Sequence, residues 1–356
     1  MLRARQMPEG PRWLSDFVLA RWEASLRVAD FMTKCAIFIG HTRDGEFRPL
    51  GTAFFVGYPL KDGACQYLVT AQHIVVGRTD LQIRLNLRNG QSEIFDLPPD
   101  QWIFHPDPAR TVDVAAMRSH VSLFIYDIVQ ISLKTDSAID DILDRWDIGI
   151  GDEVFFPGLF IHHSGQGRNL PIIRSGTIAA MRDEPIKTSS GSISAYLIEA
   201  RSIGGHSGSP VFVNMLVERP PGVVTPRRAP RPDEEKRGYY LLGLIRGHLR
   251  ARDTGEYATA IPAQDDLWVN SGIATVIPAQ DIWDTLNQPE LEEERMVAWR
   301  ASHKENVDVP DSAALPSDAS GESAAATKAD ENPAHREDFN RLVGAASKPK
   351  PKGGQT

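Results

Sequence analysis

Short apolar runs rich in β-branched and aromatic residues alternate with turn residues from Lys34 onward. Clusters of Gly, Pro, Asn and Asp separate many of these runs, a pattern typical of an all-β sandwich or barrel. Regular helical patterns between the runs are largely missing, which disfavours a doubly wound α/β fold. The predicted strands include 36–39, 51–56, 67–70, 81–87, 121–126, 154–156, 172–173, 176–179, 196–198, 210–213, 239–245 and 273–277.

A helical pattern precedes these runs. It predicts an amphipathic helix over 15–32, with Ser15 as its N-cap. We interpret its broad apolar face as a packing surface, so residues 1–33 form a helical extension. Two rows of apolar residues at steps of three or four make that face: Phe17, Ala20, Ala24, Val28 and Phe31, and beside them Val18, Trp22, Leu26 and Ala29.

Two segments have the composition of surface or disordered chain. Residues 218–237 contain five prolines and many charged residues, and predict a long surface loop between two strands. Residues 303–356 are rich in Ala, Ser, Pro and charged residues, and they bury too little apolar surface to offset the entropy of ordering. We therefore expect a folded domain over 34–290 and a polar, disordered tail over 291–356.

Overall composition narrows the classes of protein. The chain has 356 residues, 41% of them hydrophobic, and a formal net charge of -8. This size allows one large domain or two small ones, and mild acidity argues against a general nucleic-acid binder. No run of about 18 apolar residues exists, so neither a transmembrane helix nor a membrane partner is expected. Charged residues interrupt the N-terminal region, which predicts no secretory signal and a cytoplasmic protein.

Cysteine and histidine usage gives no clear signal for a disulfide scaffold or a metal site. Cys35 and Cys65 are too few for a disulfide scaffold, and the sequence leaves open whether they form one bridge or stay as two reduced, buried residues. The pair His162 and His163 has no further histidine, cysteine or carboxylate cluster at ligand spacing nearby. We interpret that pair as part of a loop.

Catalytic chemistry is indicated first by the segment Gly-Gly-His-Ser-Gly-Ser-Pro-Val at 204–211. A serine hydroxyl is a poor nucleophile until a base takes its proton, and it must lie where backbone N–H groups can hold an oxyanion. Glycines around Ser207 permit the tight turn that this requires. Pro210 then ends the turn and an apolar strand begins.

Two further segments supply a base and a carboxylate. The run Tyr-Leu-Val-Thr-Ala-Gln-His at 67–73 ends an apolar strand on His73, and Thr-Val-Asp-Val-Ala-Ala at 111–116 sets Asp113 at the start of another. A carboxylate that orients an imidazole is normally buried, and an acid within an apolar strand start suits that need. Asp107 is the nearest alternative to Asp113.

Together these segments resemble the trypsin-like serine peptidases, including their bacterial members. Thr-Ala-x-His, Asp-Val-Ala and Gly-x-Ser-Gly-x-Pro follow one another in the order His73, Asp113, Ser207, which that fold uses. The resemblance covers roughly residues 34–287 and implies two six-stranded antiparallel β-barrels, with their boundary near 135–150. It also implies a serine endopeptidase that acts on protein or peptide substrates without a metal or organic cofactor.

The resemblance implies roles for individual residues. His73 is the general base, Asp113 orients it, Ser207 is the nucleophile, and the backbone N–H groups of Gly205 and Ser207 form the oxyanion hole. Arg201 stands near the position where digestive members place a specificity residue, and a cation there favours an acidic substrate side chain. The resemblance also implies that the strand containing Leu244 lines the substrate cleft.

The sequence also departs from the family pattern. His206 replaces the acid that pairs with a freed N-terminus in digestive members, so activation by N-terminal cleavage is not supported. Ser209 replaces a glycine, which is a mild change.

Three alternatives remain open. An α/β-hydrolase would use Gly205, Ser207 and the downstream His248, but Ser209 removes the last glycine of that elbow. A trypsin-like fold with a blocked cleft would serve as a binding module. A sensor that stays inactive until a protein partner binds lies between the two, with 15–32 and 218–237 as regulatory segments.

Overall fold

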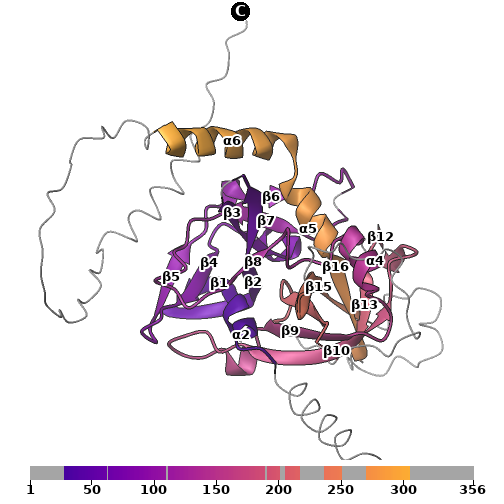
Figure 1. The fold of residues 1–356 in the computed structure, drawn as a ribbon. Coiled ribbons are helices and arrows are strands. Elements are labelled where there is room, and N and C mark those ends of the chain that lie inside the picture. Colours follow the sequence, from indigo (N-terminus) through magenta and orange to yellow (C-terminus); the bar gives the residue numbers. More distant parts are fainter. Residues whose placement is uncertain are drawn as a thin grey trace, which may run out of the picture.

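The computed structural model describes residues 28–61, 63–109, 111–188, 191–200, 205–216, 236–250 and 270–304. The described chain is mostly β, which confirms the predicted class (Figure 1). The predicted helix over 15–32 lies largely outside the described residues, as do most of the 218–237 loop and all of 305–356.

One half of the fold is a sheet of eight strands. Its order is β5-β4-β1-β2-β3-β7-β6, and β8 pairs in parallel with β2. Asp44 and Gly45 connect β1 to β2 with φ values of 56° and 78°, the left-handed geometry of a tight hairpin turn. The strands are β1 Ile37–Arg43, β2 Glu46–Leu60, β3 Gly63–Thr70, β4 Gln82–Asn86, β5 Ser92–Asp96, β6 Ile103–Phe104, β7 Ala115–Arg118 and β8 Gln130–Ser132.

The other half is a closed six-stranded barrel in the order β10-β13-β16-β15-β14-β9. A two-stranded ribbon, β11 Ile186–Thr188 with β12 Gly191–Ile193, lies between β10 and β13 in the sequence. The barrel strands are β9 Glu153–Gly158, β10 Ile172–Ala180, β13 Tyr196–Glu199, β14 Pro210–Asn214, β15 Tyr239–Arg250 and β16 Asn270–Pro278.

The first half is an eight-stranded sheet with one parallel pair, and a second closed barrel is not clearly shown there. One strand prediction needs correction. The run 121–126 is mostly turn, with a single bridge from Tyr126 to Leu87. A local apolar run shows that side chains are buried, but strand pairing depends on a partner from elsewhere in the chain.

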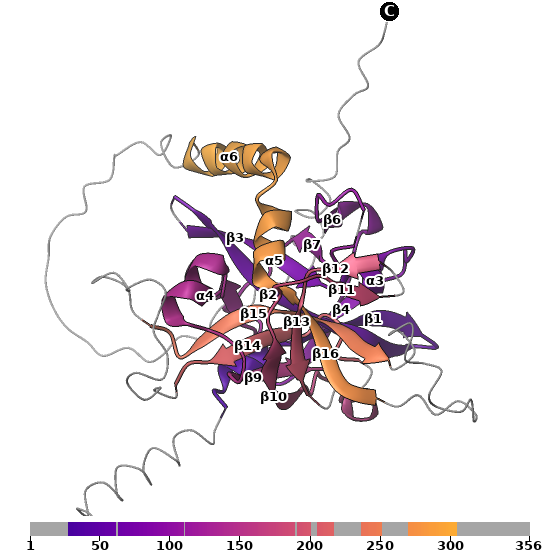
Figure 2. The same cartoon turned by 90° about the vertical axis from the view of Figure 1, so that its right-hand side faces the viewer.

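Helices are short and lie around the two β units (Figures 1 and 2). Helix α2 begins at Phe31 and ends at Cys35, and residues 28–30 before it are not helical, so the described end of the predicted helix over 15–32 differs from the prediction. The helices are α2 Phe31–Cys35, α3 Gln72–Val75, α4 Asp140–Trp146, α5 Ala279–Leu286 and α6 Pro289–Lys304, and the 3₁₀ turns are η1 Pro99–Gln101 and η2 Ile161–His163.

Helix α6 contradicts the prediction that disorder begins at residue 291. Arg295 anchors it: the guanidinium lies 3.9 Å from the Tyr58 ring centroid and donates hydrogen bonds to the Leu286 carbonyl (2.7 Å) and the Tyr67 hydroxyl (3.2 Å). Arg295 is only 2% exposed. A composition rule counts polar residues as solvated, and it therefore missed an arginine that is buried against aromatic rings.

One apolar core runs from the sheet into the barrel. It joins Phe54 and Leu68 of the sheet to Phe212, Leu244 and Ile277 of the barrel, while a second cluster fills the barrel around Phe156 and Tyr196. Cys35 and Cys65 are both free and buried, and burial raises the pKa of the Cys35 thiol. Because the two β units share a core, the segments between them are held in fixed relation.

Candidate active site

His73 and Asp113 form a paired imidazole and carboxylate beside the junction of the two β units. His73 lies in α3, directly after β3, and Asp113 lies two residues before β7. Oδ2 of Asp113 is 2.7 Å from Nδ1 of His73, and Oδ1 accepts the His73 backbone N–H at 2.9 Å. This contact places the ring proton on Nδ1 and leaves Nε2 able to accept a proton.

Asp107, the alternative carboxylate, accepts hydrogen bonds from residues of its own loop. Its oxygens accept hydrogen bonds from the backbone N–H groups of Ala109 and Thr111 and from the Thr111 hydroxyl. The bonds from Thr111 lower the pKa of Asp107 to about 2. Asp107 thus holds the loop that leads to Asp113.

Ser207 lies on a turn fixed by two glycines in the left-handed region. Gly205 has φ 105° and Gly208 has φ 80°, values that other residues reach only with strain. The Thr52 backbone N–H donates to the Ser207 carbonyl at 2.9 Å, and the Gly208 N–H donates to the Ile245 carbonyl at 2.7 Å. The turn is therefore bonded to the sheet on one side and to the barrel on the other.

The Ser207 hydroxyl points to the backbone of β15. It donates to the carbonyl of Arg246 at 3.2 Å, and among the described residues no hydrogen bond joins it to His73. The structure thus brings Ser207, His73 and Asp113 to one region without completing the contact between nucleophile and base. Since Ser207 has one side-chain torsion, a change of rotamer is the movement that can redirect its Oγ.

The turn also arranges backbone donors. Thr52 Oγ1 donates to the Gly205 carbonyl at 3.1 Å and accepts the Leu159 N–H at 3.0 Å. This fixes the peptide unit between Gly205 and His206. Within the described part of the chain, no hydrogen bond is found from the backbone N–H groups of Gly205 and Ser207.

His206 fills the space beneath the turn. It is 1% exposed, packs edge-to-face on Phe156 with ring centroids 5.5 Å apart, and accepts a hydrogen bond from Arg174 Nε at Nε2 (3.2 Å). Its Nδ1 lies 3.5 Å from the Ser209 hydroxyl. The His206 ring thus contacts an aromatic ring, a guanidinium and the hydroxyl of Ser209.

The two predicted substrate-binding residues fare differently. Arg201 lies outside the described residues. Leu244 is on β15, opposite Pro210 and Ile277, and is fully buried in the shared core. The Leu244 side chain thus points into the core, because the side chains of a strand alternate between faces, and its contact with substrate stays a prediction.

Sequence reasoning missed three residues that surround the predicted triad. Arg246 contacts Asp113, with Nε 3.6 Å from Oδ2, Thr52 holds the Gly205 peptide, and Arg174 holds His206. Thr52 belongs to a run predicted as a strand, and Arg246 follows one. Neither run carries a local signal for its partner, because the partners lie 153 and 133 positions away respectively.

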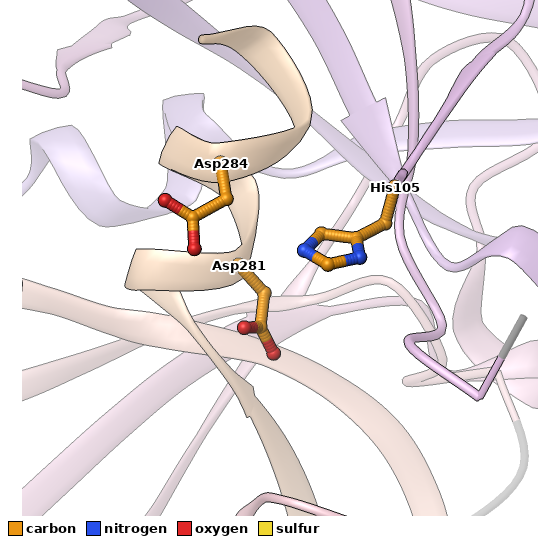
Figure 3. Close-up of side chains that lie close together, drawn as sticks. All are labelled: His105, Asp281 and Asp284. Carbon is orange, nitrogen blue, oxygen red and sulfur yellow. The ribbon is translucent and has the colours of Figure 1, made fainter. Parts of the chain in front are cut away.

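A second titratable cluster lies between β6 and α5. His105, Asp281 and Asp284 place one ligand atom each within 4.8 Å of one another, and the imidazole faces the two carboxylates (Figure 3). Burial lowers the pKa of His105. Burial and the charges of Asp284 and Asp107 raise the pKa of Asp281 to about 7, against the opposing charge of Arg182.

The hydrogen bonding of His105 argues against a metal ligand. Its Nδ1 accepts the Asp107 backbone N–H at 3.1 Å, so the neutral ring carries its proton on Nε2, toward the carboxylates. A metal-bound histidine normally donates from its other nitrogen. His162 and His163, in η2, are exposed and lie outside this cluster.

Comparison with known proteins gives structural neighbours only. No protein-family model and no curated protein sequence matches the chain. The MamO protease domain from Magnetospirillum magneticum (apo form) has a TM-score of 0.44 and 14% identity, covering 73% of this chain and 100% of its own. Rv3671c from M. tuberculosis H37Rv, a serine-to-alanine mutant in an inactive form, has a TM-score of 0.37 and 15% identity, covering 72% and 87%.

At these scores and identities the likeness carries no information about activity or substrate. No helix among the described residues is long and apolar enough to cross a membrane.

Proposed function

We propose that this chain is a trypsin-like serine endopeptidase that hydrolyses peptide bonds through an acyl-enzyme on Ser207. In this proposal the eight-stranded sheet corresponds to the first barrel of the family. The observation that carries it is the bidentate contact of the Asp113 carboxylate with His73, at its ring nitrogen and at its backbone N–H. A carboxylate 8% exposed that orients an imidazole in this way is the arrangement that a general base requires.

The first half-reaction uses the groups already in place. After Ser207 rotates toward His73, Nε2 takes the hydroxyl proton while Oγ attacks the substrate carbonyl carbon. The carbonyl π electrons move onto oxygen, where the N–H groups of Gly205 and Ser207 stabilise the negative charge. Asp113 stabilises the imidazolium. Collapse of this intermediate breaks the C–N bond, and His73 returns its proton to the leaving amine.

The second half-reaction repeats these roles with water. His73 takes a proton from water as the water oxygen attacks the acyl carbon, and the oxyanion forms in the same position. The Ser207 ester bond then breaks and the serine oxygen regains the proton from His73. The products are a free carboxylic acid and the resting enzyme, and no metal or organic cofactor takes part.

One observation favours a second candidate, a latent protein that works as a sensor or binding module. Ser207 Oγ donates a hydrogen bond to the Arg246 carbonyl, and among the described residues it makes none with His73. In that case a protein partner, or the substrate itself, shifts Ser207 between two rotamers. A protein or peptide substrate, an activating partner and a cytoplasmic location all remain proposals from the sequence.

Labelling with a fluorophosphonate probe tests the endopeptidase. The parent chain is compared with Ser207→Ala, His73→Ala and Asp113→Asn, and His162→Ala serves as a control at an exposed loop histidine. We expect the parent and His162→Ala to react, with the adduct located on Ser207 by peptide mass spectrometry. The first two variants should not react, and Asp113→Asn should react at least about a hundredfold more slowly.

Two results separate the candidates. Reaction of the parent at a serine other than Ser207 contradicts the proposed mechanism. No reaction of a folded parent, judged by circular dichroism and a cooperative melt, supports the latent protein. Profiling the labelled enzyme on a peptide library then identifies the preferred side chain.

A further inference from the structure

The Asp113 carboxylate has two basic neighbours, His73 and Arg246. Its Oδ2 lies 2.7 Å from Nδ1 of His73 and 3.6 Å from Nε of Arg246. Among the described residues these are the charged groups within 4 Å of that carboxylate. A guanidinium stays charged throughout the accessible pH range, whereas the imidazole gains its charge only during reaction or at low pH.

This ion pair is shielded from solvent. The Asp113 side chain is 8% exposed and that of Arg246 is 24% exposed, so water screens their attraction less than it does at the surface. The single negative charge of Asp113 therefore interacts with the guanidinium of Arg246 at all times, and with a cation at His73 only when that imidazole is protonated. In general, a neighbouring positive charge disfavours a second cation.

Arg246 also contacts the other end of the predicted triad. Its backbone carbonyl accepts the Ser207 hydroxyl at 3.2 Å, while its side chain reaches Asp113. Both contacts come from one residue of β15, a strand that is continuous with the barrel core at Leu244 and Ile245. The residue thus joins the nucleophile to the orienting carboxylate by a path that does not pass through His73.

We propose that Arg246 is a positioning residue that shares the Asp113 carboxylate with His73 and so restrains formation of the His73 imidazolium. This inference rests on the proposed function for its catalytic meaning. Removal of the guanidinium charge leaves the whole carboxylate charge to His73. Because the acceptor of Ser207 is a backbone carbonyl, substitution at 246 keeps that acceptor and isolates the effect of the charge.

The test follows the His73 imidazole by nuclear magnetic resonance of histidine-labelled protein across pH 4–9. Arg246→Ser removes the charge, Arg246→Lys retains it, and Arg48→Ser removes an exposed arginine elsewhere. His73→Ala assigns the resonance. We expect the titration midpoint of His73 to rise in Arg246→Ser by about 0.5 to 2 pH units, as Coulomb's law gives for charges roughly 6 Å apart at effective dielectric constants between about 80 and 20. In Arg246→Lys and Arg48→Ser it should stay near the parent value.

An unchanged midpoint in a folded Arg246→Ser overturns the inference. If that variant does not fold, Arg246→Gln, which fills more of the space without charge, replaces it. The fluorophosphonate rate gives a second readout: its acidic limb should move to higher pH by the same amount, while the plateau rate increases several-fold. If no variant reacts with the probe, the proposed function fails, but the resonance titration still decides the role of Arg246.

Discussion

Thr52 and Gly205 are joined by a hydrogen bond of 3.1 Å from the threonine hydroxyl to the glycine carbonyl. The same hydroxyl accepts the backbone N–H of Leu159 at 3.0 Å, and Thr52 is fully buried. One side chain of the sheet therefore fixes two loops of the barrel. One of those loops contains the Gly205–His206 peptide, which precedes Ser207. The sheet therefore helps to set the geometry of the candidate oxyanion hole.

Thr52→Val is expected to lower the free energy of unfolding by about 1 to 3 kcal/mol. The change is nearly isosteric, but it leaves the buried Leu159 N–H without its acceptor and releases the Gly205 carbonyl. Thr52→Ser keeps the hydroxyl and serves as the matched control. Urea denaturation measures the stability. The probe reaction of Ser207 should also slow by at least about tenfold in Thr52→Val. Equal stability of the two variants would contradict this role for the hydroxyl.

Gly208→Ala is expected to destabilise the turn more than the same change at Gly77. Both glycines lie in the left-handed region, with φ of 80° and 76°, so both variants meet a backbone cost of about 1 kcal/mol. A Cβ at 208 would also lie 2.0 Å from the Thr52 carbonyl oxygen and 2.5 Å from Thr70 Oγ1, whereas a Cβ at 77 meets nothing within 4 Å.

Thermal and chemical denaturation distinguish the two glycine variants. We expect Gly208→Ala to lose at least about 3 kcal/mol or to fail to fold, because fully packed backbone does not yield readily. Gly77→Ala should retain most of its stability. A loss of similar size in both variants would show that φ alone, and not the contact with the sheet, explains the glycine at 208.

The raised pKa of Asp281 leads us to expect that the stability of the protein depends on pH. Its pKa is raised from 3.8 to about 7 by burial and by neighbouring acids, so the folded state binds this proton more tightly than the unfolded chain does. The free energy of unfolding should therefore fall as pH rises from about 4 to about 7, by up to roughly 4 kcal/mol. Asp281→Asn removes this contribution and flattens the profile.

Chemical denaturation at pH 4, 5, 6 and 7 measures the slope for Asp281. Asp100→Asn, at an exposed position, is the control and should follow the parent. The difference between Asp281→Asn and the parent should grow steadily toward pH 7, with the variant more stable there. A constant difference across this range contradicts the raised pKa.

Arg295 is expected to hold α6 against the sheet. Arg295→Ala removes a contact with the Tyr58 ring and hydrogen bonds to the Leu286 carbonyl and the Tyr67 hydroxyl. We expect a loss of about 2 to 4 kcal/mol and faster amide hydrogen exchange across α6. Glu294→Ala, exposed on the same helix, is the control and should change neither value. Unchanged exchange in Arg295→Ala would show that α6 docks by other contacts.

Local pattern in the sequence predicted much of the described fold. Short continuous apolar runs indicated β2, β3, β14 and β16 near their observed positions, because strands buried on both faces leave such runs in the sequence. The glycines at 205 and 208 indicated a left-handed turn at Ser207, since few other residues adopt it. These features depend on residues close together in the chain, so a short sequence motif is enough to predict them.

The tertiary structure decided what depends on distant partners. It added a parallel strand to the first sheet, directed Leu244 into the core, and folded the start of the predicted tail into α6 around Arg295. It also set Arg246 beside Asp113 and turned the Ser207 hydroxyl to the Arg246 carbonyl. The sequence by itself predicted which residues would carry acid, base and nucleophile chemistry. Their contacts depend on pairing and burial between segments more than a hundred positions apart, and local pattern contains no record of those partners.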